Sequence, residues 1–227
     1  MVQERSERTR GRLVEAGAVL FDRRGYAGAT LGEIAAAAGV TKGALYFHFA
    51  SKEELARAVS GQAERSLRSA CAELRAASSP LQGLIDAGYW LVDALGADPV
   101  IRAAFRLGRE DAGWQTAPTT AGPTPADSRQ PAFADIRGFH SVWAGVVRDL
   151  LAGARRAGEL RDRSGGLGPE TLVVTAACGL EVVFADGCPA EERARRVGAL
   201  WDWLLPCLVR PGTAGGYRTR PSVPRPA

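Results

Sequence analysis

Hydrophobic positions recur every three to four residues along most of the chain, a spacing that predicts α-helices. In the first such segment, from about Ser6 to Arg24, Leu13, Leu20 and Phe21 fall on one face. Arginines occupy the opposite face, where they either contact phosphates or form a solvated surface. Gly25 is expected to end this helix, because glycine accepts the left-handed backbone found at helix ends. No segment has the pattern of a strand, so the sequence predicts an all-α protein.

Two short helices joined by a tight turn are predicted within residues 30–49. Thr30, followed three residues later by Glu33, forms a capping box that marks the start of the first helix. Gly39 is expected to end that helix, and Thr41 to cap the next one. Such a helix-turn-helix places the N-terminal residues of its second helix at base edges in the DNA major groove. Residues 1–50 are therefore expected to form a three-helix DNA-binding domain.

Further helices are predicted over most of the remaining chain. Their expected ranges are 51–77, 81–95, 100–110, 133–157, 169–185 and 189–208. Residues 111–129 have no periodic pattern and predict a loop, in which Trp114 either covers a pocket or tethers the loop. We expect a second, helical domain over residues 51–208 and a disordered basic tail over residues 209–227, which is rich in Pro and Gly.

The last two predicted helices are apolar over most of their circumference. The second of them carries Val197, Leu200, Trp201, Leu204 and Leu208. Such helices either complete the core of a monomer or pair with the same helices of a second subunit in a four-helix interface. Pairing is favoured here, because a helix-turn-helix protein that reads a palindrome needs two copies.

Composition and charge narrow the class of protein. No apolar run approaches the roughly 20 residues that span a bilayer. The polar N-terminus does not have the pattern of a secretory signal, so a cytoplasmic protein is expected. The net charge of +4 is typical of nucleic-acid binding, but the four arginines that follow Val209 account for all of it. The argument for DNA binding therefore depends on the helix-turn-helix.

The sequence has little that indicates an enzyme. Its two histidines, His48 and His140, lie in distant segments, and no nucleophile motif, phosphate loop or metal-ligand cluster is present. Four cysteines lack the short paired spacing of a zinc site and are expected to be reduced, mostly buried thiols. They are Cys71, Cys178, Cys188 and Cys207. We expect no catalytic activity, no metal and no cofactor.

The segment from Thr30 to Leu55 resembles the DNA-binding domain of the tetracycline-repressor family of bacterial regulators. The likeness includes the aromatic run from Tyr46 to Phe49 and the helix start Ser51-Lys52-Glu53-Glu54, both in register. Within that family, Val40 to Leu55 is similar to the γ-butyrolactone autoregulator receptors of actinomycetes. The segment from Asp98 to Leu107 and the single Trp143 on its helix extend this similarity, more loosely, into the rest of the chain.

This resemblance implies a homodimer that binds a palindromic double-stranded DNA operator as a repressor. A small apolar ligand such as a γ-butyrolactone would enter a pocket in the helical ligand-binding and dimerisation domain and release the DNA. The long helix that begins near Ser51 would carry the movement to the DNA-binding domain. Two alternatives stay open: a pseudo-receptor of the same family that senses an antibiotic or biosynthetic intermediate, and a DNA-binding adaptor with no small ligand.

The resemblance assigns DNA contacts to eight positions. Lys42, Gly43 and Ala44 are expected to face the bases, and this agrees with their chemistry, because lysine reaches guanine acceptors and a methyl suits the thymine methyl. Contacts to phosphates are expected from Thr30, Thr41, Tyr46, His48 and Lys52. Phe47 and Phe49 are expected to lie in the core of the domain instead.

The resemblance also places Trp143 on the wall of the ligand pocket, with Tyr89, Phe105 and Val146 as expected neighbours. Cys178 stands where these receptors commonly have a threonine. Loss of that hydroxyl donor removes a hydrogen bond of about 1 kcal/mol to a lactone carbonyl. The expected ligand of this chain is therefore not restricted to butyrolactones.

Overall fold

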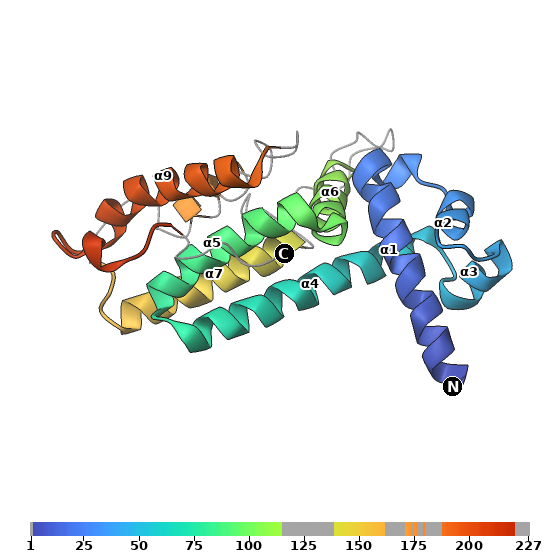
Figure 1. Cartoon of the computed structure of the whole chain (residues 1–227), viewed down its shortest axis with the longest axis horizontal. Coiled ribbons are helices and arrows are strands. Elements are labelled where there is room, and N and C mark those ends of the chain that lie inside the picture. The colour runs from blue at the N-terminus through green and yellow to red at the C-terminus, as the bar shows by residue number, and fades with distance from the viewer. Residues whose placement is uncertain are drawn as a thin grey trace, which may run out of the picture. The chain divides into compact units, whose positions relative to one another are not determined.

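The computed structural model describes residues 2–114, 139–161, 171–173, 175–176, 179 and 188–220. Within these ranges the chain is helical, with no strand and a single isolated β-bridge between Leu160 and Val209 (Figure 1). The all-α prediction is confirmed. The elements are α1 (Val2–Gly28), α2 (Leu31–Ala37), α3 (Lys42–His48), α4 (Lys52–Ala77), α5 (Pro80–Ala97), α6 (Pro99–Trp114), α7 (Phe139–Arg156), α9 (Ala190–Leu208) and the short 3-10 helix η1 (Ala214–Gly216).

Side-chain caps define the ends of α2 and α3 as the sequence predicts. Thr30 Oγ1 accepts a hydrogen bond from the Glu33 amide at 3.3 Å, and the Glu33 carboxylate accepts one from the Thr30 amide at 3.3 Å. Gly39 has a φ of 64°, the left-handed conformation that closes α2. Thr41 Oγ1 then accepts from the Ala44 amide at 3.2 Å and caps α3. The predicted helix-turn-helix is therefore confirmed at its caps and at its turn.

The chain folds into two compact units. The first consists of Met1–Glu64 and Pro99–Val142, and the second of Arg65–Asp98 and Trp143–Ala227. The packing units thus differ from the expected boundary at residue 50, because α6 and the first half of α4 pack with the N-terminal helices. The division into a DNA-binding and a ligand-binding domain stays a prediction about function.

The first unit is built around α1, which packs against both α6 and α2. Phe21, Leu45 and Phe49 are fully buried in its core. The helix begins at Val2, earlier than predicted, and leaves helical geometry at Gly25, where φ is 73°. A side chain at Gly25 would also collide with the carboxylate of Glu110, so this position needs glycine for two reasons.

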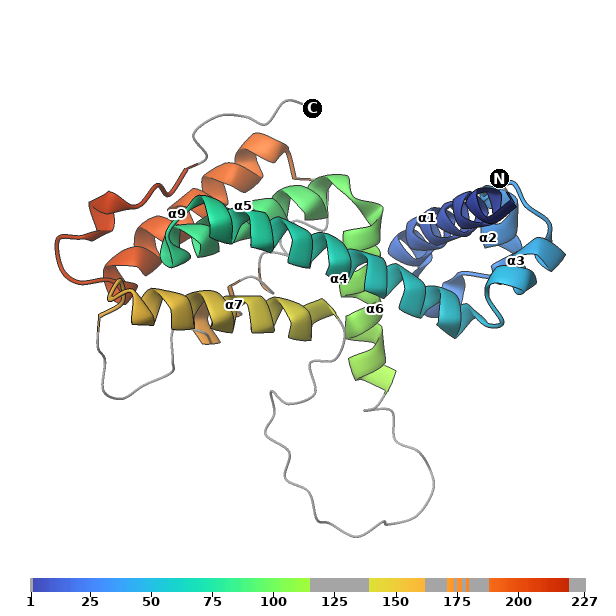
Figure 2. The ribbon, with the colours of Figure 1, turned by 90° about the horizontal axis from the view of Figure 1, so that it is seen from below.

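In the second unit, α5 packs against α4, α7 and α9 (Figures 1 and 2). A Cβ at Gly83 would lie 3.6 Å from Leu150 of α7 and 3.7 Å from the Leu74 carbonyl oxygen of α4. The first turn of α5 is fixed by the Leu81 amide, which donates to Glu159 Oε2 at 3.0 Å. α5 is accordingly buried on most of its circumference, as its apolar pattern predicts.

Two predicted helices differ in extent from those observed or lie partly outside the described residues. α6 continues to Trp114, past its predicted end at Glu110. Several predicted parts lie outside the described residues: the Trp114 side chain, residues 115–129 of the predicted loop, residues 133–138 of the predicted 133–157 helix and most of the predicted 169–185 helix. Residues 171–173, 175–176 and 179 of that helix are helical.

The segment 209–220 is ordered, and the prediction of disorder is wrong for these residues. Val209 is fully buried and pairs with Leu160. Tyr217 Oη donates to Glu159 Oε1 at 3.2 Å, and the Arg218 amide donates to Gln82 Oε1 at 2.9 Å. The Pro- and Gly-rich composition predicts disorder, but the groups that fix this segment come from distant parts of the chain. Residues 221–227 lie outside the described residues.

The described cysteines occupy three different environments. Cys71 is buried, Cys188 is partly exposed and Cys207 is exposed, so the expectation of mostly buried thiols holds for Cys71 alone among them. Burial raises the pKa of the Cys71 thiol to about 11, against the opposing effect of nearby Arg75. Cys71 is therefore protonated at neutral pH. Cys178 lies outside the described residues.

Candidate nucleic-acid interface and ligand site

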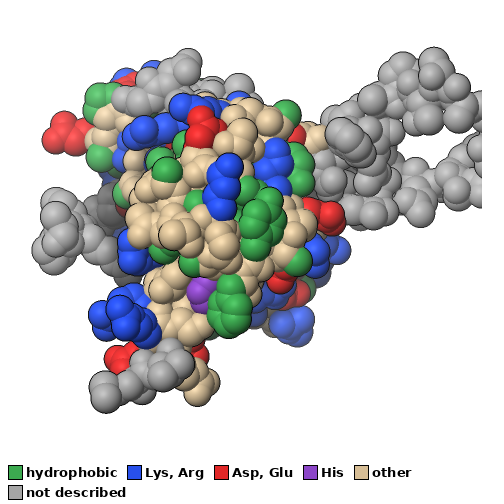
Figure 3. Space-filling view, turned by 90° about the vertical axis from the view of Figure 1, so that its right-hand side faces the viewer, with side chains coloured by type: hydrophobic (Ala, Val, Ile, Leu, Met, Phe, Trp, Pro, Cys, Tyr) green, Lys and Arg blue, Asp and Glu red, His purple; other side chains and the backbone are tan. Residues whose placement is uncertain are grey.

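One exposed face of α3 carries residues that the sequence assigns to DNA. Lys42, Gly43, Tyr46 and Phe47 are all exposed, and their spacing places them on the same side of a helix with 3.6 residues per turn. Hydrophobic side chains stand on the face of α2 and α3 between Lys and Arg side chains (Figure 3). Ala44, the third predicted base-facing residue, is half-buried. This face offers a cation, small residues and aromatic rings in one place.

The predicted core position of Phe47 is wrong, because its side chain is 81% exposed. Leu45 and Phe49, four residues apart, are the ones that fill the core. Phe47 lies two residues from each and therefore points to the opposite side of the helix, about 200° around its axis. Its ring packs edge-on against His48, with centroids 5.2 Å apart. The helical register of Leu45 is the signal that identifies Phe47 as a surface residue.

Gly32 on α2 makes room for Lys42. A Cβ at position 32 would lie 2.9 Å from Lys42 Cε and 3.3 Å from its Nζ. The end of the lysine side chain therefore lies against α2 at Gly32. A side chain supported in this way loses less rotamer entropy when it contacts a base.

Lys52 is bonded within the first unit. Its ammonium donates to the carbonyl oxygens of Tyr26 at 2.7 Å and Ala29 at 3.0 Å, and it lies 4.4 Å from the centroid of the Tyr26 ring. These bonds hold the turn between α1 and α2. An ammonium has three donors, so one remains for a phosphate, and the predicted phosphate contact stays a prediction.

The same turn is held from α6. Glu110 Oε2 accepts a hydrogen bond from the Tyr26 amide at 2.7 Å, and Glu110 Oε1 pairs with Arg106 Nε at 3.0 Å. Arg106 also donates to the Asp22 carbonyl oxygen at 2.6 Å, and Arg102 Nε lies 2.8 Å from Asp22 Oδ2. Glu110 of α6 thus binds the Tyr26 amide, and Lys52 of α4 binds the Tyr26 carbonyl oxygen.

Two arginines of α1 serve the structure of the domain. Arg12 donates to the carbonyl oxygens of Ala38 and, at 3.4 Å, of Gly39, so it caps the C-terminal end of α2. The Arg10 guanidinium lies 4.8 Å from the centroid of the Phe49 ring. These contacts fix the turn and the end of α3 against α1. Arg10 and Arg12 are two of the α1 arginines, with Arg5 and Arg8, for which the sequence allows either phosphate contacts or a solvated face.

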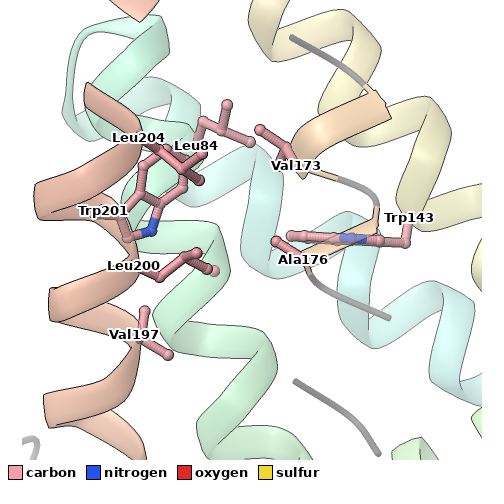
Figure 4. Close-up of a pocket in the computed structure, with 9 residues that line it drawn as sticks. Leu84, Trp143, Val173, Ala176, Val197, Leu200, Trp201 and Leu204 are labelled. Atoms are coloured by element: carbon pink, nitrogen blue, oxygen red, sulfur yellow. The ribbon is translucent and has the colours of Figure 1, made fainter. Parts of the chain in front are cut away.

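In the second unit, apolar side chains surround a hollow beside Trp143 (Figure 4). Trp143 and Ala176 lie on one side of it, and residues of α9 face them from the other side (Figure 4). The open centre of this hollow accommodates only about one water molecule. A larger molecule would have to move side chains apart. The remaining lining residues are Leu84, Gly88, Val173, Val197, Leu200, Trp201 and Leu204.

The indole N–H of Trp143 is a polar group in this otherwise apolar wall. The side chain is 1% exposed, and its Nε1 has no hydrogen-bond acceptor among the described residues. Buried N–H groups are nearly always paired, so an unpaired one calls for an explanation. A carbonyl oxygen of a bound molecule would supply the missing acceptor.

The other predicted ligand residues are placed elsewhere. Tyr89 and Val146 are buried in the second unit but do not line this hollow, and Tyr89 Oη donates to the Thr219 carbonyl oxygen. Phe105 belongs to the first unit, where its ring packs edge-on against Phe139. Of the predicted ligand residues that the structure describes, Trp143 alone reaches the hollow. Cys178 lies outside the described residues.

α9 supplies residues of the hollow that the sequence assigns to dimer pairing. Val197 and Trp201 face inward and are buried, so the apolar stripe expected to meet a second subunit belongs to the interior of this unit. The outer face differs: Trp203 is 82% exposed, and Ala199 and Cys207, four residues to either side, are exposed as well. α9 is therefore apolar on two sides, and the outer one is free for pairing in the described chain.

The described residues contain little that would support catalysis. They include no group of three or more His, Cys, Asp or Glu placed to hold a metal ion. His48 lies on α3, and His140 packs edge-on against Phe105. Among the helices that the structure describes, none has the length and hydropathy needed to span a membrane.

Comparison with known proteins identifies the family. The domain described as "Bacterial regulatory proteins, tetR family" matches residues 13–59, from α1 into α4. The A-factor receptor protein of Streptomyces griseus is 31% identical over 211 residues, which cover 92% of this chain and 67% of the receptor. The chain belongs to the tetR family of bacterial regulatory proteins. Its family is one of regulators and not of enzymes.

Solved structures extend the similarity over nearly the whole tetR-family chain. A γ-butyrolactone receptor described as an ArpA-like protein is 31% identical, with a TM-score of 0.67 and coverage of 93% of this chain and 94% of that one. CprB of Streptomyces coelicolor, solved in complex with its operator sequence, is 31% identical, with a TM-score of 0.69 and the same coverage. The predicted resemblance to γ-butyrolactone receptors is confirmed.

Proposed function

We propose that this tetR-family chain is a homodimeric, cytoplasmic repressor that leaves a palindromic operator when a small apolar ligand of the γ-butyrolactone type binds beside Trp143. The observation that carries this proposal is the buried indole N–H without a described acceptor, on the wall of an apolar hollow. It occurs in a chain that is 31% identical to an A-factor receptor. The proposal has a DNA-reading part, a ligand part and a pairing part.

The DNA-reading part is the exposed face of α3. Lys42 is exposed and would donate to guanine acceptors, and the exposed Phe47 would offer an apolar surface to a thymine methyl or a sugar. Thr41 and the first amides of α3 face outward, where they suit a phosphate. In a two-fold dimer, two copies of α3 would enter major grooves about one helical turn, roughly 34 Å, apart.

The ligand part is the hollow in the second unit. A lactone carbonyl would accept from Trp143 Nε1, and an alkyl chain would lie among Leu84, Leu200 and Trp201. Because the centre of the hollow is narrow, the ligand must move these side chains as it binds. A binding site that opens only with ligand gives the ligand a preference for one conformation, which is the requirement for allosteric release of DNA. The continuous helix α4, which belongs to both units, is the proposed route of the movement.

The pairing part is the outer face of α9. An indole that is 82% exposed leaves a large apolar area in water, and burying it against a second subunit would contribute about 2 kcal/mol or more per subunit. Trp203, Ala199 and Cys207 would meet their counterparts across a two-fold axis. The two-fold axis of such a dimer would relate the two copies of α3 as it relates the two halves of a palindromic operator.

The test begins with selection of a duplex from a random library by the full-length protein. The affinity of the chain for that duplex is then measured by fluorescence anisotropy with A-factor and with unsubstituted γ-butyrolactone. We expect A-factor or a related acyl lactone to release the DNA, and Trp143→Phe, which keeps an aromatic ring without the N–H, to need about fivefold more ligand. Trp90→Phe, a change outside the hollow, is the matched control.

The outcome also separates the alternatives. Release by an antibiotic or biosynthetic intermediate but by no lactone would identify a pseudo-receptor, an alternative favoured by Cys178 at the position where the receptors it resembles commonly have threonine. DNA binding that no small molecule changes, with Trp143→Phe behaving as the parent chain, would contradict sensing and leave an adaptor.

A further inference from the structure

The C-terminal segment of the described chain, residues 209–220, crosses the second unit as a strap. It leaves the end of α9 at Val209, which pairs with Leu160. Further along, Tyr217 Oη bonds to Glu159 Oε1 at 3.2 Å, and the same carboxylate accepts from the Leu81 amide at the start of α5. These contacts turn the chain back toward α5. We call residues 209–220 the C-terminal strap.

Gln82 of α5 grips the strap through its backbone. Gln82 Oε1 accepts from the Arg218 amide at 2.9 Å, and Gln82 Nε2 donates to the Arg218 carbonyl oxygen at 3.2 Å. Gln82 Nε2 also donates to Asp86 Oδ1 at 2.9 Å, which fixes the orientation of the amide group. Gln82 is 7% exposed, so a buried amide group makes both of these hydrogen bonds to the Arg218 backbone.

Gly198 of α9 allows the strap to approach that helix closely. A Cβ at position 198 would lie 3.0 Å from Tyr89 Oη and 3.1 Å from the Thr219 carbonyl oxygen. Tyr89 of α5 donates its hydroxyl to that same carbonyl oxygen. The peptide of Thr219 is therefore packed against both helices at once. A larger residue at position 198 would push the strap outward.

The residues that hold the strap alternate in sequence with those that line the hollow. On α5, Gln82 and Tyr89 contact the strap, and Leu84 and Gly88 between them line the hollow. On α9, Gly198 meets the strap, and its neighbours Val197, Leu200 and Trp201 line the hollow. The strap thus ties together the two helices that form most of the wall around the space beside Trp143.

We propose that the C-terminal strap is a clasp that holds α5 to α9 and thereby sets how easily the hollow beside Trp143 opens to an apolar molecule. The centre of the hollow is narrow, so an occupant must separate the two helices, and each strap bond resists that separation. A site that is open only part of the time binds its ligand more weakly by the fraction of time it is open. The strap therefore lowers the affinity for any apolar occupant. It favours an occupant large enough that its contacts with the hollow offset the free energy of breaking the strap bonds.

The charges around the strap support a reversible clasp. Arg210, Arg218 and Arg220 are its charged residues, and it contains no acid. The acidic groups that act on Tyr89, beside the strap, are Asp86, Asp93 and Asp202. Attraction between the basic strap and these three carboxylates is screened by salt, so the clasp is expected to loosen as the salt concentration rises.

The test compares two chain ends and one point variant without any natural ligand. A chain that ends at Arg210 lacks most of the strap, and a chain that ends at Arg220 keeps it and is the matched control. Gln82→Leu keeps the side-chain volume and removes two bonds to Arg218. The probe is the apolar dye 1-anilinonaphthalene-8-sulfonate, with hydrogen exchange at the Arg218 amide as a second measurement.

Loss of the two Gln82 bonds is expected to speed exchange at the Arg218 amide roughly 10- to 30-fold. Dye affinity should rise at least severalfold in Gln82→Leu and in the chain that ends at Arg210, and remain at the parent value in the chain that ends at Arg220. Leu200→Phe, which fills the hollow, should cancel the gain in dye binding. Equal dye binding in all folded chains, or a gain that survives Leu200→Phe, would overturn the proposal.

This inference rests on the proposed ligand site for its biological meaning, but its test does not. The point variant keeps the proposal testable if the shortened chain fails to fold. If the strap variants open the hollow and no lactone or antibiotic releases DNA, the proposed sensing function fails and the clasp stands. If ligands release DNA and the strap variants bind dye as the parent chain does, the clasp alone fails.

Discussion

Removal of the Glu110 carboxylate tests whether α6 fixes the turn that leads to the reading helices. Glu110 lies far from the exposed face of α3 in sequence and makes no predicted DNA contact. It holds the Tyr26 amide at 2.7 Å and pairs with Arg106 at 3.0 Å. Glu110→Ala should therefore weaken operator binding indirectly, by loosening the connection between α1 and α2.

The size of the effect follows from these two contacts. A hydrogen bond to a charged acceptor is worth about 1.5–3 kcal/mol when buried, and the 37% exposure of the Glu110 side chain reduces this to about 1 kcal/mol. The partly exposed ion pair with Arg106 adds about 0.3–0.5 kcal/mol. A total loss of about 1.5 kcal/mol corresponds to a Tm lower by roughly 3–6 °C for a chain of this length. Operator affinity should fall about 3- to 10-fold if the loosened turn carries most of that loss.

The assays are thermal unfolding followed by circular dichroism and anisotropy on the selected operator. Glu53→Ala is the matched control, because Glu53 is exposed and lies 3.9 Å from its partner Arg57. A double-mutant cycle with Lys52→Ala adds a sharper criterion, since Lys52 holds the carbonyl of the same Tyr26. We expect a coupling of about 0.5 kcal/mol or more between the two positions. Glu110→Ala that melts and binds DNA as Glu53→Ala does would refute this reasoning.

Four further outcomes are expected. Lys42→Ala should reduce the preference for operator over scrambled DNA by about 1–3 kcal/mol, and equal losses on both duplexes would contradict a base contact. Phe47→Ala should weaken operator binding without lowering Tm, and a lower Tm would indicate that Phe47 stabilises the core. Cys71, whose pKa burial raises to about 11, should resist thiol reagents at pH 7.5 in the folded chain, so rapid labelling there would contradict its burial. Trp203→Asp should convert the dimer to monomer in sedimentation velocity, and an unchanged dimer would exclude the outer face of α9 from pairing.

The fold was predictable where local chemistry decides it. The boundaries of α2 and α3 follow from Thr30, Glu33, Gly39 and Thr41, each of which acts within four residues of its own position. The end of α6 was not, because this part of α6 packs against α1 and Glu110 accepts a hydrogen bond from the Tyr26 amide, 84 residues earlier in the chain. Local signals give the caps, and tertiary contacts decide whether a helix stops.

The candidate sites show the same division. Exposure of Lys42 and Thr41 follows from helix register, and Trp143 reaches an apolar hollow as the resemblance implies. The engagement of Lys52 with two carbonyl oxygens could not be read from the sequence, because those oxygens belong to a turn more than twenty residues away. The order of the C-terminal strap could not be predicted from the sequence for a related reason. Its stabilising groups, Gln82 and Tyr89, lie 130 or more residues before their partners.

The exposed aromatic residues point to where this chain meets other molecules. Phe47 is predicted to lie in the core, yet its side chain is 81% exposed on α3, and Trp203 is 82% exposed on α9. A folded chain buries large apolar side chains when its own elements can cover them, so an exposed ring at a helical position means that none of the described elements covers it. For Phe47 the proposed partner surface is duplex DNA, and for Trp203 it is a second subunit. Sequence patterns assign such residues to the interior because they detect the need for burial and not the identity of the molecule that provides it.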